Sequence, residues 1–173
     1  MTTALAFLTA FLAFQAGAPG LQQRPKGDPA DQTVKVVREG GQTVLPEDAY
    51  GLYRFPNKDS GKASNFGEGV QINEQFGEIN GYVTVPGPKD KLSSYFLSEV
   101  KGGNGHFSFE TRQVHGIWYS FDGHVERGSG ATAADDGYYQ MTGTLTTHDE
   151  TAKTTQDRAV TLKLTGQHQM LMH

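Results

Sequence analysis

The sequence predicts an all-β protein, most directly an antiparallel β-barrel of the lipocalin-like kind, with a β-sandwich as the alternative. From residue 34 onward, short runs rich in Val, Thr, Tyr and Phe are separated by clusters of Gly, Asn and Asp, which is typical of strands and turns. The runs alternate apolar and polar side chains, the pattern of a half-buried strand. Eight or nine such antiparallel strands either close into a barrel or fold into two packed sheets.

The clearest element is a hairpin over residues 106–126. Phe107 and Phe109 share one side of its first strand, and Tyr119 and Phe121 share one side of its second, because side chains alternate along a strand. A three-residue loop, Val114-His115-Gly116, places both aromatic sets on one face, with Gly116 in the left-handed conformation. A two-residue loop shifts the register and mixes apolar with charged residues. Since the buried face sets register, the three-residue loop is predicted.

The same register predicts the polar face of the hairpin. It pairs His106 with His124, Ser108 with Asp122, Glu110 with Ser120, and Arg112 with Trp118. An arginine over an indole is a cation–π pair worth about 0.5–1 kcal/mol at an exposed site.

The remaining elements are assigned from the same signals. Strands are expected over residues 33–38, 42–45, 50–55, 67–72, 77–85, 107–113, 117–126, 138–146 and 159–164. The segment 92–100 fits either a short helix or an edge strand. Loops are expected over 56–61, 127–137 and 147–157, the last two flexible by their polar composition. Gly102, Gly103 and Gly105 are expected to break the chain before the hairpin, and Gly143 predicts a bend or a close approach within a strand.

One curved apolar surface follows from these assignments. The side chains predicted to line a ligand cavity are Phe107, Phe109, Tyr119, Phe121, Tyr139 and Met141. A barrel of this size can enclose one small apolar ligand. The competing interpretation is a packed aromatic core, which the same pattern also produces.

The N-terminus and the composition indicate the compartment. Residues 1–20 combine an uncharged apolar run with small residues suited to cleavage, which predicts a signal peptide, with a buried helix as the alternative. Residues 21–32 read as a flexible lead-in to a single domain over 33–173. The run is too short to span a bilayer comfortably. The chain has no cysteine and a net charge of −4, which excludes disulfides and disfavours nucleic acid as a partner. A periplasmic or secreted protein is expected.

No catalytic motif is present in the sequence. It contains no nucleophile elbow, HExxH, EF-hand or phosphate-binding loop, so we expect no enzyme activity, no cofactor and no metal. A cluster of His106, Asp122 and His124 could hold a divalent ion or serve a small secreted enzyme, but an exposed polar face explains these residues equally well. His148, His168 and His173 are expected to be solvated in loop or tail.

Four short motifs resemble the YceI-like family of periplasmic lipid-binding β-barrels. They are Leu92-x-Ser94-x-Phe96, FSFET at 107–111, YQMTGTLTTH at 139–148 and VTL at 160–162. The resemblance covers residues 92–164; the segment 149–158 is longer than its family counterpart and lacks proline. It implies an extended lipocalin-like barrel with an isoprenoid or other long-chain lipid in its lumen.

The leading hypothesis is therefore a periplasmic or secreted binding protein that holds an apolar or amphiphilic, lipid-like ligand in a barrel, without stable membrane insertion. The alternative is a β-sandwich interaction or carbohydrate-binding module with Trp118, Tyr95 and Tyr138 exposed. An outward, solvated Trp118 favours the module.

Overall fold

The computed structural model describes residues 33–41, 43–55, 69–86 and 91–166. The expected signal peptide, the lead-in, the loop 56–61, His168 and His173 lie outside these ranges. Among the described residues, no helix has the length and apolarity needed to cross a membrane.

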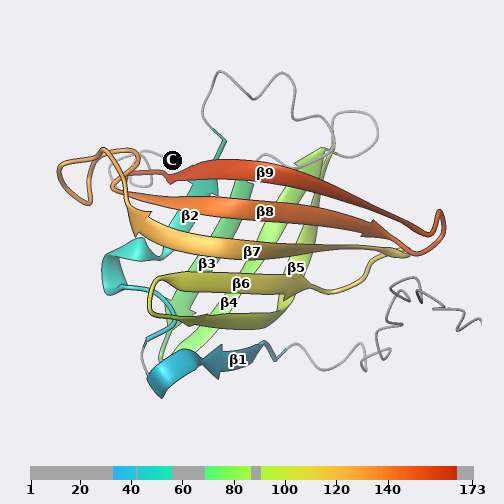
Figure 1. Ribbon diagram of the computed structural model, residues 1–173, viewed down its shortest axis with the longest axis horizontal. Helices are drawn as coiled ribbons and strands as arrows, with labels where there is room; N and C mark the ends of the chain where they lie inside the picture. The colour runs from blue at the N-terminus through green and yellow to red at the C-terminus, as the bar shows by residue number, and fades with distance from the viewer. Residues whose placement is uncertain (1–32, 42, 56–68, 87–90, 167–173) are drawn as a thin grey trace, which may run out of the picture.

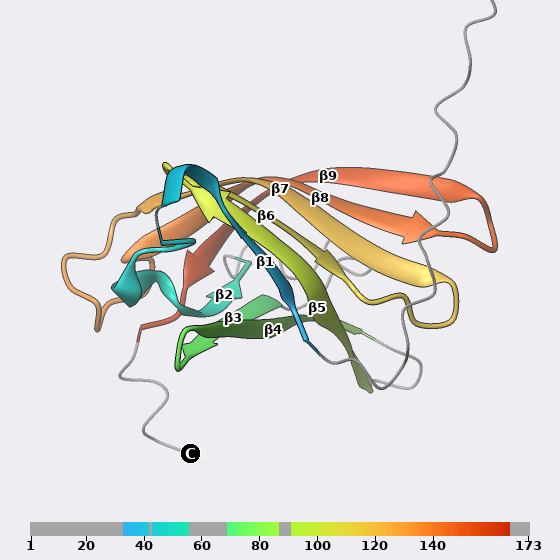
Figure 2. The same cartoon turned by 90° about the horizontal axis from the view of Figure 1, so that it is seen from below.

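Eight antiparallel strands form a closed barrel, so the all-β barrel prediction is confirmed and the sandwich alternative is wrong. Each strand from β2 to β8 pairs with the next along the chain, and β9 pairs with β2 to close the ring. Figures 1 and 2 show the ring from two directions. The strands are β2 (Gly51–Arg54), β3 (Gly69–Gln75), β4 (Glu78–Pro86), β5 (Leu92–Gly103), β6 (His106–Thr111), β7 (Ile117–Arg127), β8 (Tyr139–Asp149) and β9 (Thr154–Leu164).

A ninth strand, β1 (Lys35–Arg38), runs parallel to β5 outside the ring. β1 pairs with residues 99–102 of β5, and β6 pairs with the same part of β5 on its opposite edge. β1 therefore lies on the same edge of β5 as β4, which pairs further along, at residues 92–96. Figure 2 shows β1 beside β5.

The ambiguous segment 92–100 belongs to β5, the longest strand. Gly102 and Gly103 do not break the chain but are the last two residues of this strand, where they admit a neighbouring segment, whereas Gly105 lies in the turn that follows. A Cβ on Gly102 would lie 2.8 Å from Val44 Cγ1, and one on Gly103 would lie 3.0 Å from Glu39 Cβ. Backbone contact this close needs glycine.

The predicted three-residue hairpin loop is wrong. Val114 and Ile117 exchange both backbone hydrogen bonds, at 2.8 and 3.0 Å, so the turn contains only His115 and Gly116. Both have positive φ, 52° and 84°, as a type I′ turn requires. The same turn occurs at Phe76-Gly77 and Asn104-Gly105.

The predicted register of the hairpin is nevertheless confirmed at its three inner pairs. His106 pairs with His124, Ser108 with Asp122 and Glu110 with Ser120. Between the pairs Glu110–Ser120 and Val114–Ile117, the first strand has three residues and the second has two. This extra residue is a bulge, and it restores the register that the shorter turn would have shifted.

The bulge makes the predicted Arg112–Trp118 pair wrong. The backbone amide of Arg112 donates to Phe96 O at 2.7 Å, and its guanidinium donates to Thr33 O at 3.3 Å. Trp118 has His148 as its partner in β8.

Two further expectations are wrong. Residues 147–157 are not a flexible loop, because β8 continues to Asp149 and β9 begins at Thr154, so only 150–153 form the turn. Residues 43–45 form no strand; a short 3-10 helix, η2 (Glu47–Ala49), follows them. Another, η1 (Glu39–Gly41), follows β1.

The close approach predicted at Gly143 is confirmed. Gly143 faces Gly123 across β8 and β7, and a Cβ on Gly143 would lie 2.7 Å from Gly123 Cα. The Phe121 ring covers both glycines, with Cζ 2.8 Å from either added Cβ. This pair lets two long strands bend together around the barrel.

The Phe76-Gly77 turn offers a test of backbone strain. Phe76 is 96% exposed and has a φ of 55°, so its ring gains no burial while its backbone adopts a conformation that asparagine tolerates better. Phe76→Asn is expected to raise the free energy of unfolding by about 0.5–1 kcal/mol, measured by urea denaturation. An unchanged or lower value would contradict this interpretation; Leu92→Asn, 55% exposed but within a strand, is the control.

Candidate functional site

The six predicted cavity residues all belong to the barrel core. Five are buried, and Tyr139 is half-buried against them. The rings of Phe107, Phe109 and Phe121 contact one another, with centroids 5.6 to 6.4 Å apart. Met141 is fully buried in the same core. The structure thus brings the predicted set together as a continuous apolar interior.

One end of this interior is closed by the segment between β1 and β2. Val44, Leu45 and Ala49 are buried there. The segment passes from β5, where Val44 lies against Gly102, to β2, where the Tyr53 hydroxyl donates to Ala49 O at 2.6 Å. Figure 1 shows it at the left end of the barrel. This crossing caps the interior with apolar side chains.

The other end of the interior carries polar atoms. Tyr95 of β5 and Tyr119 of β7 meet edge to face, with centroids 4.9 Å apart. Thr147 of β8 is the register partner of Tyr119, and its Oγ1 is buried without a hydrogen-bond partner among the residues that the structure describes. The fully buried Thr111 accepts a hydrogen bond from the Tyr119 amide at 2.9 Å. An orphaned buried hydroxyl is uncommon and calls for an explanation.

Burial keeps these phenols neutral. Desolvation, assisted by the neighbouring Tyr95, raises the pKa of Tyr119 to about 12. Desolvation alone raises the pKa of Tyr95. Neutral phenols both donate and accept hydrogen bonds, so this end of the barrel can hold an uncharged or an anionic polar group.

Tyr95 and Thr147 were not predicted as site residues. Tyr95 was expected to be exposed only under the module alternative, and Thr147 was expected to be in a loop. The structure places both inside the barrel. Alternation from Leu145 to Thr147 would have placed Thr147 inward had β8 been extended in the prediction.

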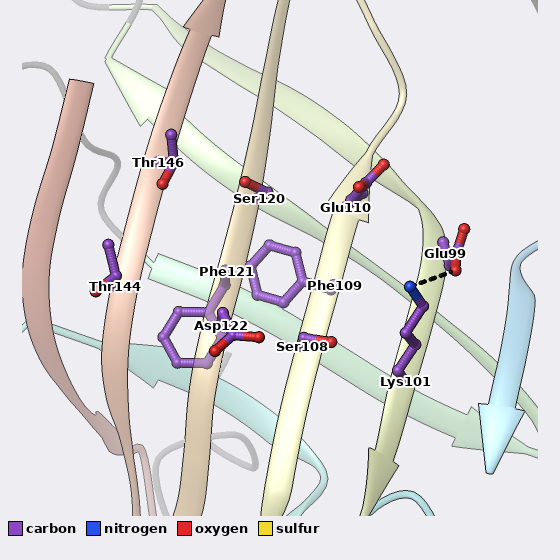
Figure 3. Close-up of a pocket in the computed structure, with 10 residues that line it drawn as sticks. All are labelled: Glu99, Lys101, Ser108, Phe109, Glu110, Ser120, Phe121, Asp122, Thr144 and Thr146. Carbon is purple, nitrogen blue, oxygen red and sulfur yellow. Dashed lines mark ion pairs between the residues drawn. The ribbon is translucent and has the colours of Figure 1, made fainter. Parts of the chain in front are cut away.

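A hollow lies on the outer face of β5 to β8. It has a volume of about 310 Å³, and Figure 3 shows its lining. Two cross-strand rows form it. One row is Lys101, Ser108, Asp122 and Thr144, and the other is Glu99, Glu110, Ser120 and Thr146.

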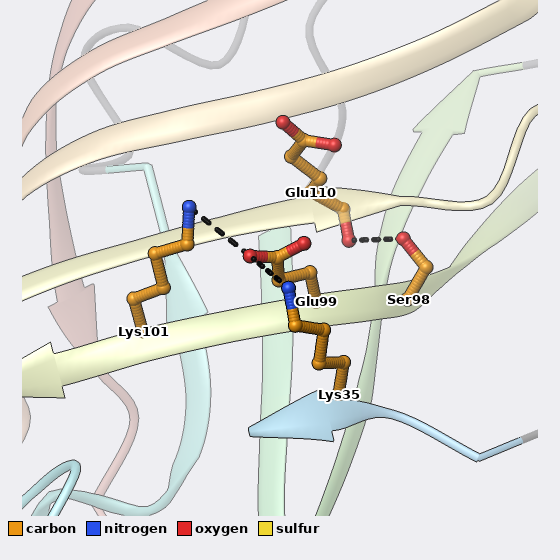
Figure 4. Close-up of polar contacts among 5 residues, drawn as sticks. All are labelled: Lys35, Ser98, Glu99, Lys101 and Glu110. Atoms are coloured by element: carbon orange, nitrogen blue, oxygen red, sulfur yellow. Dashed lines mark hydrogen bonds and ion pairs between the residues drawn. The ribbon is translucent and has the colours of Figure 1, made fainter. Parts of the chain in front are cut away.

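An ion-pair network forms one wall of this hollow, as Figure 4 shows. Glu99 Oε1 lies 3.0 Å from Lys101 Nζ and 3.4 Å from Lys35 Nζ. Partial burial acts to raise the pKa of Glu99, but the two lysines outweigh it and the net pKa is lowered. Ser98 Oγ donates to Glu110 O at 3.1 Å. Glu99 is therefore ionised and held in place.

Trp118 points outward, beside the second row. Its ring stacks on His148, with centroids 4.6 Å apart and planes 6° apart, and Ser120 Oγ lies 2.8 Å from His148 Nε2. The prediction of a solvated loop position for His148 is wrong. Of the other aromatics expected on a module surface, Tyr95 is buried, and Tyr138 is half-buried under Arg127, 3.5 Å from its ring centre.

His106 lies beside the first row, two residues before Ser108 on β6 and paired with His124 of β7. Its Nε2 is 3.3 Å from Asp122 Oδ2, and its Nδ1 is 3.6 Å from Glu39 Oε2. Within the described ranges, no group of three or more His, Asp or Glu side chains is arranged to hold a metal ion. The cluster places the His106 ring between the carboxylates of Asp122 and Glu39.

The comparisons with known proteins identify no relative. No protein-family model matches the chain, and no curated protein or solved structure matches it. The interpretation of the site therefore rests on its geometry.

Proposed function

We propose that this protein is a periplasmic or secreted binding protein that holds an amphiphilic, lipid-like ligand inside the barrel. The observation that carries the proposal is the buried Thr147 hydroxyl, which has no hydrogen-bond partner among the described residues and lies next to the apolar core. A ligand with one polar end would give this hydroxyl the partner that it lacks, and its hydrocarbon part would contact the apolar wall.

The two ends of the interior support a defined orientation. The closed end is apolar, with Val44 and Ala49 crossing it, so it suits a hydrocarbon tail. The opposite end carries the phenols Tyr95 and Tyr119, and Tyr119 is paired with Thr147 across β7 and β8, so it suits a polar head group. A few polar groups in an apolar concave site are the usual means of orienting a small ligand.

The wall can adapt to an occupant. Met141 is fully buried at the centre of β8, and methionine adjusts its shape more readily than branched side chains. Eight-stranded barrels either fill with side chains or hold one small ligand, and the phenylalanine cluster would then form the floor below the tail. A long-chain isoprenoid or fatty acid matches this combination, and it is also the ligand class that the family resemblance implies.

Thr147→Val separates this function from simple packing, because valine keeps the shape and removes the hydroxyl. Binding of a fluorescent polyene fatty acid is expected to weaken by about 2- to 12-fold, the value of one hydrogen bond. The free energy of unfolding of the protein without fatty acid is expected to rise by about 1–3 kcal/mol, because the unsatisfied hydroxyl is gone.

The matched control is Thr142→Val on the outer side of the same strand. Thr142 alternates with the inward Met141, so its replacement should leave fatty-acid affinity unchanged. Failure of the wild-type protein to bind the fatty acid, or equal weakening by both substitutions, would contradict the proposal.

A further inference from the structure

The hollow on the outer face lies on the other side of the sheet from the proposed lipid site. Its middle is built from small side chains, Ser108, Ser120, Thr144 and Thr146. Larger side chains border them on β5, where Glu99 and Lys101 stand. Adjacent strands lie about 4.8 Å apart, so small residues on three neighbouring strands leave a continuous depression.

The base of the hollow is rigid. Phe109 and Phe121 lie directly beneath it in the core, stacked with centroids 5.6 Å apart and planes 19° apart. All four strands that contribute side chains are paired on both edges within the barrel. A binding surface on such strands needs little ordering when a ligand arrives.

The polar groups of the hollow suit hydroxyl groups of a ligand. The hydroxyls of Ser108 and Thr144 make no side-chain hydrogen bond within the described ranges, and each can donate and accept. Asp122 has a 78% exposed side chain and contacts only His106 through it in that part of the chain. A carboxylate accepts two hydrogen bonds at once, which matches neighbouring hydroxyls on a sugar ring.

An aromatic platform adjoins these groups. Trp118 precedes Ser120 by two residues on the same face of β7, and His148 follows Thr146 by two on the same face of β8. The parallel indole and imidazole rings are held by the Ser120–His148 hydrogen bond. A sugar ring has an apolar face and polar edges. Flat aromatic rings beside carboxylates and hydroxyls match both kinds of surface.

Charge and polarity argue against two other classes of ligand, phosphates and hydrocarbons. Glu99, Glu110 and Asp122 outnumber Lys101 among the lining residues, so a phosphate would be repelled. A hydrocarbon would desolvate these carboxylates at high cost. A neutral polyol both donates to the carboxylates and accepts from the hydroxyls.

We infer that the outer hollow lined by Lys101, Asp122 and Thr146, with Trp118 beside it, is a second binding site, which takes a neutral saccharide independently of the lumen. Its volume of about 310 Å³ lies at the lower end of ordinary ligand pockets, about 300–1,000 Å³. A hollow of this size accommodates one or two sugar units but does not enclose a long saccharide chain.

Saturation-transfer NMR on the full chain tests this inference, with maltose, cellobiose, lactose and N,N′-diacetylchitobiose as probes. At least one disaccharide is expected to receive saturation from the protein. Asp122→Asn, which keeps the shape, and Trp118→Ala are each expected to weaken its binding at least tenfold. Glu126→Gln, on the same outer face of β7 but outside the hollow, should leave it unchanged.

The same variants keep the two proposals distinguishable. The Asp122→Asn and Trp118→Ala variants should bind the fluorescent fatty acid as the wild type does. The Thr147→Val variant should bind the disaccharide as the wild type does. Circular dichroism must show each variant folded. The inference is overturned if no saccharide gives a signal, or if the signal survives both Asp122→Asn and Trp118→Ala. It is also overturned if spermidine binds at the hollow while all four sugars fail to bind.

Discussion

Replacing Gly143 with valine is expected to lower the free energy of unfolding by about 3 kcal/mol. A Cβ at this position would lie 2.7 Å from Gly123 Cα and 2.8 Å from Phe121 Cζ, and it would also overlap the carbonyl oxygen of Asp122. Because two of these three neighbours are backbone atoms, the strands must separate to accommodate it. Urea denaturation followed by far-UV circular dichroism measures the loss.

Gly105→Ala is the matched control for this substitution. Gly105 has a φ of 82°, but an added Cβ there meets nothing within 4 Å, so only backbone strain is introduced. That strain costs about 1 kcal/mol. If Gly143→Val proved no more damaging than Gly105→Ala, the tight glycine contact between β7 and β8 would be contradicted.

Replacing Phe121 with alanine is expected to cost about 3–5 kcal/mol. Phe121 is 2% exposed, contacts the rings of Phe107 and Phe109, and covers the glycine pair. Its removal would therefore leave a cavity among rigid neighbours and uncover the bend of two strands. The measurement is again the free energy of unfolding in urea.

Phe96→Ala provides the comparison for Phe121→Ala. Phe96 is 59% exposed on the outside of β5 and meets only the edge of Tyr82, with centroids 5.9 Å apart, among the ring contacts of the described residues. Its replacement should cost less than about 1 kcal/mol. Equal losses for the two phenylalanines would show that Phe121 is not packed as the structure places it.

The faces of the central hairpin could be predicted because burial decides them. Phe109 and Phe121 must both reach the core, so their pairing follows from alternation alone. The turn could not be predicted in the same way, because a bulge before Val114 supplies the residue that the shorter turn removes. Register is set by many buried contacts, whereas the turn type depends on a local backbone choice.

Composition was misleading where strands extend beyond the apolar interior. The segment 147–157 is polar and was expected to be a loop, but backbone pairing between β8 and β9 continues through it to Asp149 and Thr154. Hydrogen bonds between strands do not require apolar side chains. Long strands of this kind become visible only when the partner strand is known.

The same limit explains what was missed in the two sites. The six lumen residues lie on strands with strong alternation, and the structure places them together. Tyr95 could be placed inside only after β5 was known to be a strand, and the outer hollow needs the joint register of four strands. The hairpin alone predicts half of that hollow, namely Ser108, Glu110, Ser120 and Asp122.

Native mass spectrometry of the protein, purified without detergent from its own host, tests the central claim most directly. The spectrum should contain the bare protein together with a species heavier by the mass of one lipid-like molecule, and Thr147→Val should reduce that species. A spectrum with only the bare chain, both as purified and after incubation with a lipid extract of the host, would contradict ligand binding in the barrel.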